Sequence, residues 1–465
     1  MGKPKVAFLT IAESREKFYE KRKALLSSEC RKFCRAFSKE MDILESEPIQ
    51  TVPSALLWTD RVAREQADAV IIHIPVWASP NLATKIVSNL ELPVAILGNL
   101  LPTSSSFGCM LAVAGAMGQI GKKAKRIIGD IDDAGTRKEV LQFAYACHAI
   151  QRLRRSSYCL FGGRSLGIVT TQADFSAWER DFGVDCDQKD QYEIVRRAES
   201  IDSQRTQKYL DWLKANAGDI TYSGIFAPLS LRRQINCYLA VKDIVGECAY
   251  DFISIKCQQE LSDGYALQCP VIAMLNDNYD AEGYKKAIPC ACEGDNDGAL
   301  TMEILSLIGG GMPSSLMDIR LMEPDKDELI LANCGGAPTY YAGRSSDPRE
   351  NLKQVYLMEH VFGDAGGAAV QFVCAKGPVT LARLFRVNSH YRMGLLEGEF
   401  QAMDREELRK TTYCYPHGFV KAKIDFRLFA QTMGTNHIHT LPGHCKDTLK
   451  TFCDILDIPC IDYNV

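Results

Sequence analysis

The stretch around Glu293 contains residue types that hold metals and substrates. Glu293 follows the apolar run Ala287–Cys292, and a predicted helix with the sequence DGALTMEILSLI comes directly after it. In open α/β sheets ligands bind beyond the carboxyl ends of the strands, so a carboxylate here is placed to meet a metal or a substrate. Asp295 and Asp297 follow at once, and the alternative is that these acids only begin and cap the helix. Because capping acids are frequent, the residues alone favour capping.

A second carboxylate interrupts an apolar segment. Asp318 lies in the strand-like run SSLMDIRL, between Met317 and Ile319. An acid in a strand can simply face solvent, whereas a buried acid needs a cation or hydrogen-bond donors. The residues alone leave both possibilities open.

Histidines are concentrated near the end of the chain. Five of the eight lie in its last part: His390, His417, His437, His439 and His444. In TNHIHTLPGH, His437 and His439 share one face of a predicted strand, because strand side chains alternate. Imidazole suits Mn, Fe, Co or Zn, and carboxylates favour Mn or Mg. Two carboxylates and one histidine with open positions would therefore form a catalytic metal site for an oxygen-rich substrate. For each ring, the alternative is an ordinary packed or hydrogen-bonded histidine.

Lys256 is a further candidate for substrate contact. It follows the predicted strand 251–255 (DFISI), and strand ends line the clefts of α/β proteins. GAMGQIG at 115–121 is not a G-x-G-x-x-G motif, so the sequence does not indicate a dinucleotide site.

The overall composition narrows the class of protein. The chain has 465 residues, of which 46% are hydrophobic and 24% charged, and this excludes a disordered or collagen-like chain. The net charge of −4 gives no electrostatic case for nucleic acid or an anionic membrane as partner. No apolar run approaches the roughly 20 residues of a membrane span. The start MGKPKVAFLT has no signal-peptide pattern, so we expect a cytoplasmic protein whose 18 cysteines are mostly buried free thiols.

The elements that must position these residues fall into three series. Residues 5–10, 69–74 and 94–97 read as buried strands, with an amphipathic helix containing Phe18, Leu25, Cys30, Phe33 and Phe37 after the first. Alternating strands and helices predict a parallel sheet covered on both faces. A second series begins near 159 with a Gly-rich turn and then a strand. It continues with helices at 203–216 and 229–246 and strands at 251–255, 271–275 and 287–292.

After Asp318 the pattern changes to short alternating runs. These predict an antiparallel sheet or barrel, with AKGP at 375–378 as a hairpin turn. A helix at 445–456 and a strand in IPCID close the chain. We therefore expect three domains, at residues 1–158, 159–322 and 323–465.

Several segments resemble the L-fucose isomerases and, more broadly, the L-fucose/L-arabinose isomerase superfamily. They are Gly163–Ser165, FGVDCDQKDQYEIVRRAE, IPCACEGDNDGALTMEILSLIGGGMPSSLMDIR and GTNHIHTLPGHCKDTLKTFCDILDIPCIDYNV. The resemblance implies an α/β protein with two Rossmann-like, doubly wound parallel-sheet domains followed by a β-rich, barrel-like C-terminal domain. It also implies a homo-oligomer, often a hexamer, with active sites between subunits.

The resemblance also implies roles for individual residues. Family members bind one divalent ion, usually Mn²⁺, with Co²⁺ or Mg²⁺ as alternatives, through positions that match Glu293, Asp318 and His437. Asn436 matches a residue that contacts the sugar. Further substrate contacts are expected at Lys256, where the family often has Gln, at the aromatic Tyr415, and at the additional His439.

Two departures bear on the substrate. The chain is shorter than typical L-fucose isomerases, and Lys256 and His439 are unusual for a pocket that takes a neutral deoxysugar. A cation suits an anionic sugar, and the superfamily includes isomerases that convert sulfoquinovose to sulfofructose. Because Lys also donates to the hydroxyl groups of a neutral hexose or pentose, the anionic sugar is the alternative of the two.

The implied reaction moves a proton between C1 and C2 of a sugar through a cis-enediol. Glu293 and Asp318 would serve as its acid and base beside the metal. One alternative is a sugar-binding or sensor protein that keeps the scaffold without turnover. A second alternative is a nicotinamide dehydrogenase, which the missing glycine motif disfavours.

Overall fold

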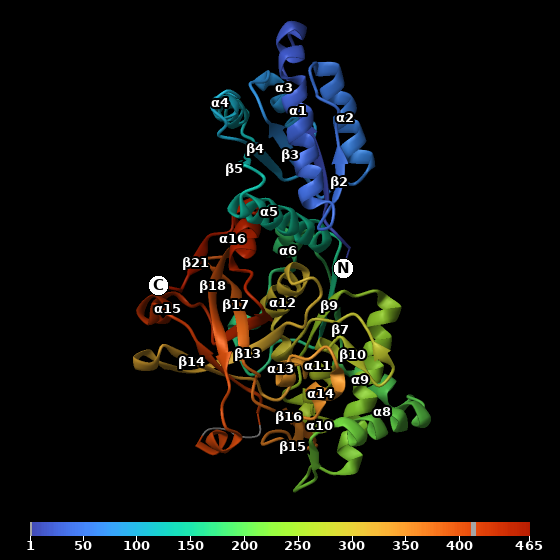
Figure 1. Ribbon diagram of the computed structural model, residues 1–465. Coiled ribbons are helices and arrows are strands. Elements are labelled where there is room, and N and C mark those ends of the chain that lie inside the picture. The colour runs from blue at the N-terminus through green and yellow to red at the C-terminus, as the bar shows by residue number, and fades with distance from the viewer. Residues whose placement is uncertain (1, 411–414) are drawn as a thin grey trace. The chain divides into compact units, whose positions relative to one another are not determined.

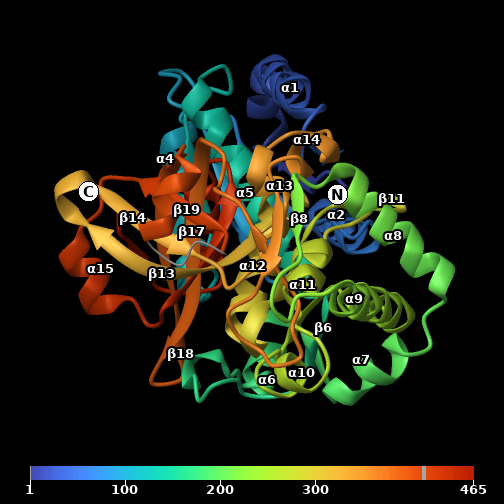
Figure 2. The same cartoon turned by 90° about the horizontal axis from the view of Figure 1, so that it is seen from below.

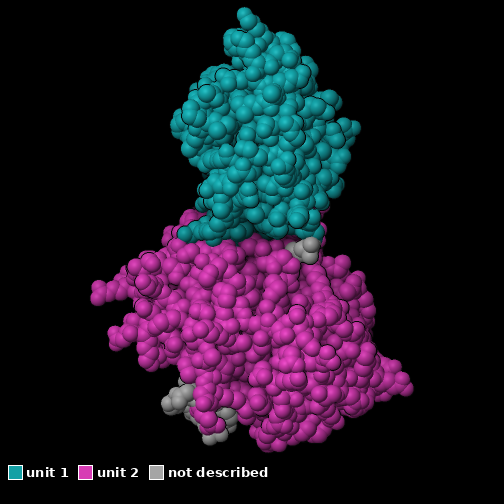
Figure 3. All heavy atoms as spheres, viewed as in Figure 1, with its two compact units in different colours: residues 1–151, 447–455 teal, residues 152–446, 456–465 magenta. Residues whose placement is uncertain are grey.

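The computed structural model describes residues 2–410 and 415–465. The chain forms two compact units (Figure 3). Unit 1 contains residues 1–151 and 447–455, and unit 2 contains residues 152–446 and 456–465. The boundaries expected at 158 and 322 stay predictions.

Unit 1 is built on a five-stranded parallel sheet with the order β2-β1-β3-β4-β5. Its strands are β1 (Lys5–Thr10), β2 (Asp42–Glu45), β3 (Ala69–Ile74), β4 (Val94–Gly98) and β5 (Lys125–Ile128). Its helices are α1 (Glu16–Phe37), α2 (Val52–Arg64), α3 (Pro80–Val87), α4 (Ser106–Gln119), α5 (Ala134–Leu153) and α16 (Lys446–Ile455). The parallel sheet predicted from the alternating strands and helices is confirmed.

Helices cover both faces of this sheet, because side chains of β1 and β3 alternate between two apolar cores. One core includes residues of α1 and α5, and the other includes residues of α2, α3 and α4. The amphipathic face of α1 is as predicted at Cys30, Phe33 and Phe37, but Phe18 is 47% exposed in its first turn.

Unit 2 contains a second parallel sheet, with the order β12-β9-β6-β7. Its strands are β6 (Ser157–Phe161), β7 (Asp185–Lys189), β9 (Phe252–Ile255) and β12 (Cys290–Ala291). The helices around it are α6 (Phe175–Phe182), α7 (Gln191–Ala198), α8 (Ser203–Asn216), α9 (Pro228–Cys248), α10 (Glu260–Gly264), α11 (Cys269–Asn276) and α12 (Asn296–Ile308).

Two predictions for this region were wrong. The run 271–275 forms part of helix α11 instead of a strand, because a short, fully buried apolar run has no periodicity that separates the two. The Gly-rich turn follows strand β6 instead of preceding a strand, and Val169–Thr171 is a short 3₁₀ helix, η1.

The β-rich C-terminal region forms a closed antiparallel barrel. Six strands pair in the order β17-β20-β13-β14-β19-β18, and β18 pairs back to β17. They are β13 (Ser315–Glu323), β14 (Glu328–Ala332), β17 (Gly377–Val387), β18 (His390–Gln401), β19 (His417–Lys421) and β20 (His437–Pro442). The closing strand β21 (Cys460–Asp462) adds to β18 in parallel, and α15 (Phe426–Thr432) precedes β20. The predicted barrel is confirmed.

AKGP is not a hairpin turn between paired strands. The strand before it, β16 (Ala368–Gln371), pairs with β15 (Tyr356–Glu359), which pairs with β8 (Asp219–Thr221). The hairpin is instead β17–β18, and its turn contains Asn388 and Ser389 at φ 50° and 65°. An asparagine–serine turn without glycine gave no recognisable hairpin signal.

The remaining short elements connect these sheets. They are the hairpin strands β10 (Tyr279–Asp280) and β11 (Gly283–Tyr284), the helices α13 (Tyr340–Gly343) and α14 (Pro348–Leu352), and the 3₁₀ helices η2 (Cys292–Gly294), η3 (Pro324–Lys326) and η4 (Arg405–Lys410). In the described ranges, the search for a helix with the length and hydropathy needed to cross a bilayer found none.

Helix α12 joins the parallel sheet of unit 2 to the barrel. Every one of its residues is buried, and it contacts β9 and β12 on one side and β17 and β20 on the other. In Figure 2, α12 lies between the barrel strands β13 and β17 and the helices α9 and α11. The helix carries polar residues such as Asp297 and Glu303 among its apolar ones, and in this enclosed position they need partners inside the protein. The start of α12 is therefore held against β20.

One buried acid on α12 makes the stability of the protein depend on pH. Burial raises the pKa of Glu303 to about 7 from 4.5, and the hydroxyl of Ser156 donates to its Oε1 at 3.5 Å. Because the folded state holds this proton more tightly, the stabilisation is complete below pH 4.5 and is lost as the pH rises through 7. Glu303→Gln should therefore raise the free energy of unfolding at pH 8 by roughly 1–3 kcal/mol and change it little at pH 4.5.

Chemical denaturation at both pH values checks this expectation. Glu139→Gln, at an exposed position of α5, is the matched control and should change neither value. Equal effects of Glu303→Gln at the two pH values would contradict the assignment.

Candidate active site

Strand pairing brings two of the candidate ligands together. His437 of β20 lies directly opposite Asp318 of β13 in the barrel. Residues opposite each other in an antiparallel pair point to the same face of the sheet. His437 Nε2 lies 3.6 Å from Asp318 Oδ1, and Asp318 is mostly buried.

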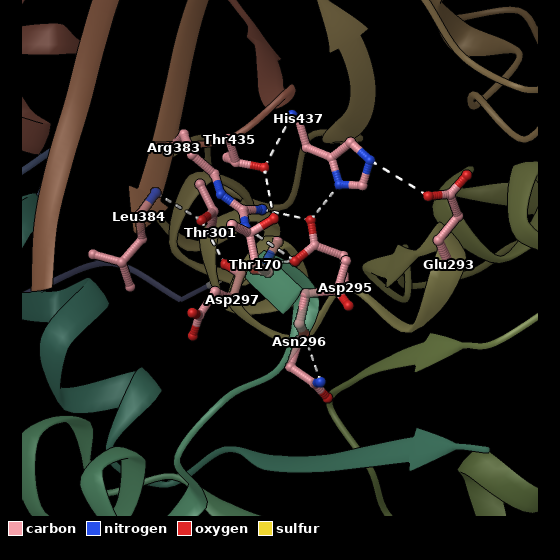
Figure 4. Close-up of polar contacts among 12 residues, drawn as sticks. Thr170, Glu293, Asp295, Asn296, Asp297, Thr301, Arg383, Leu384, Thr435 and His437 are labelled. Atoms are coloured by element: carbon pink, nitrogen blue, oxygen red, sulfur yellow. Dashed lines mark hydrogen bonds and ion pairs between the residues drawn. The ribbon is translucent and has the colours of Figure 1, made fainter. Parts of the chain in front are cut away.

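Glu293 reaches the same nitrogen from the parallel sheet. Its Oε2 is 3.5 Å from His437 Nε2, and Figure 4 shows the two side chains facing each other. Glu293 lies in η2, directly after β12, with the left-handed backbone angles φ 60° and ψ 19°. This conformation costs a non-glycine residue about 1–2 kcal/mol. Strain of this kind is commonly kept at functional sites, and here it turns a carboxylate toward the barrel.

Asp295 fixes the orientation of the His437 ring. Its Oδ2 accepts a hydrogen bond from His437 Nδ1 at 2.7 Å, while its Oδ1 accepts from Gly298 N at 2.9 Å. The predicted helix cap at Asp295 is thus confirmed, and the same carboxylate also holds the histidine. Because Nδ1 donates to Asp295, Nε2 is directed at Glu293 and Asp318, where it has no hydrogen-bond partner in the structure.

Arg383 balances the buried charge of Asp295. Both side chains are fully buried, and the guanidinium donates to the two carboxylate oxygens at 2.5 and 3.1 Å (Figure 4). Two parallel bonds of this kind are the strongest geometry for an arginine–carboxylate pair. Asp295 therefore remains an ionised acceptor in an environment without water.

The pKa values follow from this network. Burial alone would raise the pKa of Asp295, but Arg383 and His437 outweigh it and hold that pKa well below its usual range. Burial opposes protonation of His437, yet the hydrogen bond to Asp295 and the nearby carboxylate of Glu293 raise its pKa to about 10. Burial raises the pKa of Asp318 to about 6, although the charge of His437 acts in the other direction.

The donor set fits a divalent cation in kind. Two carboxylates and one imidazole suit Mn²⁺ or Co²⁺, whereas Mg²⁺ prefers oxygen ligands and tolerates the imidazole nitrogen less. Two ligands that share an ion at about 2.1 Å are about 3.0–3.5 Å apart, close to the 3.5 and 3.6 Å found here. Across residues 2–410 and 415–465, no group of three or more such side chains is already closed enough to hold an ion. A small movement of at least one ligand would be needed.

Two expected sugar contacts lie beside these ligands. Asn436 is exposed, and its Nδ2 donates to Asp318 Oδ1 at 3.2 Å. Lys256 follows β9, and its Cβ lies close to Gly294. A Cβ atom added to Gly294 would be 3.6 Å from the Cβ of Lys256. Its ammonium donates to Glu260 Oε1 at 2.5 Å.

The other two expected contacts are buried. Tyr415 packs against the ring of His360, with 5.5 Å between ring centroids. His439 shares the buried side of β20 with His437, and a Cβ on Gly298 would lie 2.7 Å from its Nε2. The role of both as sugar contacts stays a prediction, and full burial of His439 against α12 does not favour it.

The structure adds supporting residues that the sequence-based prediction missed. Arg383 was not singled out, although an arginine in the apolar run GPVTLARLFRV signals a buried acid as partner. Asp297 accepts from Tyr391 Oη at 2.9 Å and from Arg386 Nε at 3.0 Å. It holds the start of α12 to the barrel in addition to any capping. His417 of β19 and Asp318 of β13 flank the same residue of β14, because each is paired with Ala332.

Comparisons with known proteins point to one family. Residues 11–155 match the family model of the L-fucose isomerase first N-terminal domain, and residues 331–464 match that of its C-terminal domain. A sulfoquinovose isomerase of Alkalicoccus urumqiensis is 19% identical over 279 residues, which cover 59% of this chain and 57% of that protein. The match therefore spans little more than half of that relative.

Similar solved structures include two ABC transporter solute-binding proteins. The one from Burkholderia multivorans has 12% identity and a TM-score of 0.18, over 55% of this chain and 80% of that chain. The one from Actinobacillus succinogenes 130z, with bound D-allose, has 15% identity and a TM-score of 0.17, over 66% and 92%. Similarity at this level supports no argument about fold or ligand.

Removing the guanidinium should show how much the site depends on it. Arg383→Met would leave Asp295 buried without its main counter-charge, which we expect to lower the free energy of unfolding by about 3–5 kcal/mol. Urea denaturation measures the loss. Arg392→Met, at an exposed position of β18, is the matched control. The double variant Arg383→Met/Asp295→Leu should recover part of the loss, and a double variant less stable than Arg383→Met would contradict the pairing.

Proposed function

The chain belongs to the L-fucose isomerase-like family, and we propose that it interconverts an aldose and a ketose with a divalent metal ion. The observation that carries this proposal is the convergence of Glu293, Asp318 and His437. They come from three separate segments, and both carboxylates lie within 3.6 Å of one buried imidazole nitrogen. A protein that only binds sugar does not require this constellation.

Glu293, Asp318 and His437 would hold the metal. When bound, Mn²⁺, or Co²⁺ or Mg²⁺ in its place, would stabilise the negative charge that develops on the sugar oxygens. Asp295 and Arg383 keep the His437 ring in the orientation that leaves Nε2 available. Partners of this kind usually change metal affinity or activity 10- to 100-fold.

The carboxylates would also move the proton. A hydrogen on the carbon next to a carbonyl is a weak acid, so a base must lie beside it. Asp318 would accept and return this proton as one member of the pair. Glu293 faces it across His437 and would be the second member of the acid/base pair in a cis-enediol route. Asn436 and Lys256 would hold sugar hydroxyls.

For the substrate we propose one of two classes of sugar. The first is a neutral hexose or pentose, and the second is a sugar that carries an anionic group. The relative named sulfoquinovose isomerase and the cation at Lys256 support the anionic class. The ammonium of Lys256 is paired with Glu260, so an anionic substrate would compete with that carboxylate. We also propose a cytoplasmic homo-oligomer, such as a hexamer, with active sites between subunits.

A substrate screen tests the proposal directly. The protein, supplied with Mn²⁺, is incubated in D₂O with aldoses and ketoses that include sulfoquinovose, and products are followed by NMR. We expect one sugar to isomerise and to take up deuterium at C1 or C2. Glu293→Gln should lower kcat roughly 10²- to 10⁴-fold, the contribution of a positioned proton-transfer group.

Glu91→Gln, at an exposed position of unit 1, is the control and should keep full activity. Isomerisation by Glu293→Gln at an undiminished rate would refute its role. If the protein binds a sugar but does not isomerise it with any divalent metal ion supplied, the result would favour the sensor alternative.

Metal affinity should depend on pH in a defined direction. The pKa of His437 is about 10 in the absence of metal, so below that pH an incoming ion must displace a proton from its ring. The apparent Kd for Mn²⁺ should fall about tenfold per pH unit between pH 7 and 9. Calorimetry in buffers of different ionisation enthalpy should detect about one proton released per ion. His437→Gln should bind Mn²⁺ weakly and without this pH dependence, and a pH-independent affinity of the unaltered protein would contradict the assignment.

A further inference from the structure

Four cysteines gather around the candidate ligand Glu293. A small cavity is lined by the side chains of Cys257, Cys269, Cys292, Glu293, Cys334 and His360. The cysteines in the part of the chain that the structure describes are free thiols, as predicted for most of them. The proposed isomerase chemistry uses none of these sulfur atoms.

Cys292 and Cys334 form the closest pair in this group. Their Sγ atoms are 3.4 Å apart, near van der Waals contact. Cys292 is in η2, one residue before Glu293, and Cys334 follows the end of β14. Formation of a disulfide requires the two sulfurs to approach by a further 1.4 Å or so, to about 2.05 Å.

Cys334 is held where it can react. Its carbonyl oxygen accepts hydrogen bonds from His360 Nε2 at 2.6 Å and from Cys269 Sγ at 3.3 Å. Its side chain is half-buried, whereas Cys292 is almost fully buried. Hydrogen bonds from Cys269 and Cys292 lower the pKa of the Cys334 thiol against the opposing effect of burial. A thiolate is the form of cysteine that attacks peroxides.

We propose that Cys292 and Cys334 are an oxidisable pair that forms a reversible disulfide when the protein meets hydrogen peroxide. The thiolate of Cys334 attacks one peroxide oxygen and becomes a sulfenic acid, and the O–O bond breaks to release hydroxide. The thiol of Cys292 then attacks that sulfur, the S–O bond breaks, and water leaves. In total two thiols lose two electrons, and one peroxide becomes two waters.

The disulfide would act on the candidate active site through the chain itself. Cys292 is bonded to Glu293, whose left-handed backbone already lies in a restricted region. Pulling the Cys292 sulfur toward Cys334 would shift the backbone of Glu293 and so disturb the approach of its carboxylate to His437. This consequence rests on the proposed function, whereas the disulfide itself does not. Oxidation should lower turnover roughly 10- to 100-fold, and dithiothreitol should restore it.

Mass spectrometry tests the pair without reference to activity. The full-length protein is treated with hydrogen peroxide, free thiols are alkylated under denaturing conditions, and proteolytic peptides are analysed. We expect a cross-linked peptide that contains Cys292 and Cys334 and that disappears on reduction. Cys334→Ser should abolish it, and Cys269→Ser should retain it.

Cys248→Ser removes an exposed thiol far along the sequence and serves as the matched control, with the cross-link unchanged. The proposal is overturned if Cys292 and Cys334 are both recovered alkylated after Cys248 has been oxidised. It is also overturned if Cys334 is cross-linked to Cys269 instead. If the cross-link forms in a protein without isomerase activity, the oxidisable pair stands and the proposed function fails.

Discussion

The buried contact between Arg383, Asp295 and His437 is the interaction on which the rest of the site depends. A carboxylate without access to water is tolerated only when cations and donors surround it. Here the guanidinium comes from β17, the imidazole from β20 and the backbone donor from the first turn of α12. Because all three must meet at one carboxylate, the barrel and the start of α12 cannot shift independently. The same contact aims His437 Nε2 at Glu293 and Asp318.

Barrel closure explains how residues distant in sequence reach this point. The register of β13 against β20 places Asp318 opposite His437, and a slip of one residue would turn one of them to the other face. Helix α12 is buried on all sides between β9 and β20, so its first turn has a single possible position. Asp297 adds a second anchor there through Arg386 and Tyr391. The geometry of the candidate site therefore follows from the packing of one enclosed helix against one closed sheet.

Much of this could be predicted from the sequence, and the exceptions have physical causes. Strands such as Ala69–Ile74 were recognisable because parallel strands are apolar on both faces. The run 271–275 is apolar throughout, as such strands are, but it folds as part of α11. A helix that is buried on all sides has the same apolar sequence as a buried strand. Glu293 and Asp318 were singled out from their places in the sequence, and His437 as one of five C-terminal histidines. Family resemblance combined the three into one site, and the structure brings them together. Asp295 was interpreted only as a cap, because no local pattern shows that a capping carboxylate also meets a histidine from the barrel.

The two carboxylates of the site have different mechanical support. Asp318 lies within a strand that is paired on both sides, and its Oδ1 accepts a hydrogen bond from Asn436. Glu293 lies instead on a turn where it and Gly294 both have positive φ, between a two-residue strand and α12. A change in the neighbouring thiols therefore reaches Glu293 through one peptide unit, whereas it reaches Asp318 across space, through the charge of Cys334. Any adjustment that closes the ligands around an ion is for the same reason expected at Glu293, with Asp318 and His437 as the fixed side of the site.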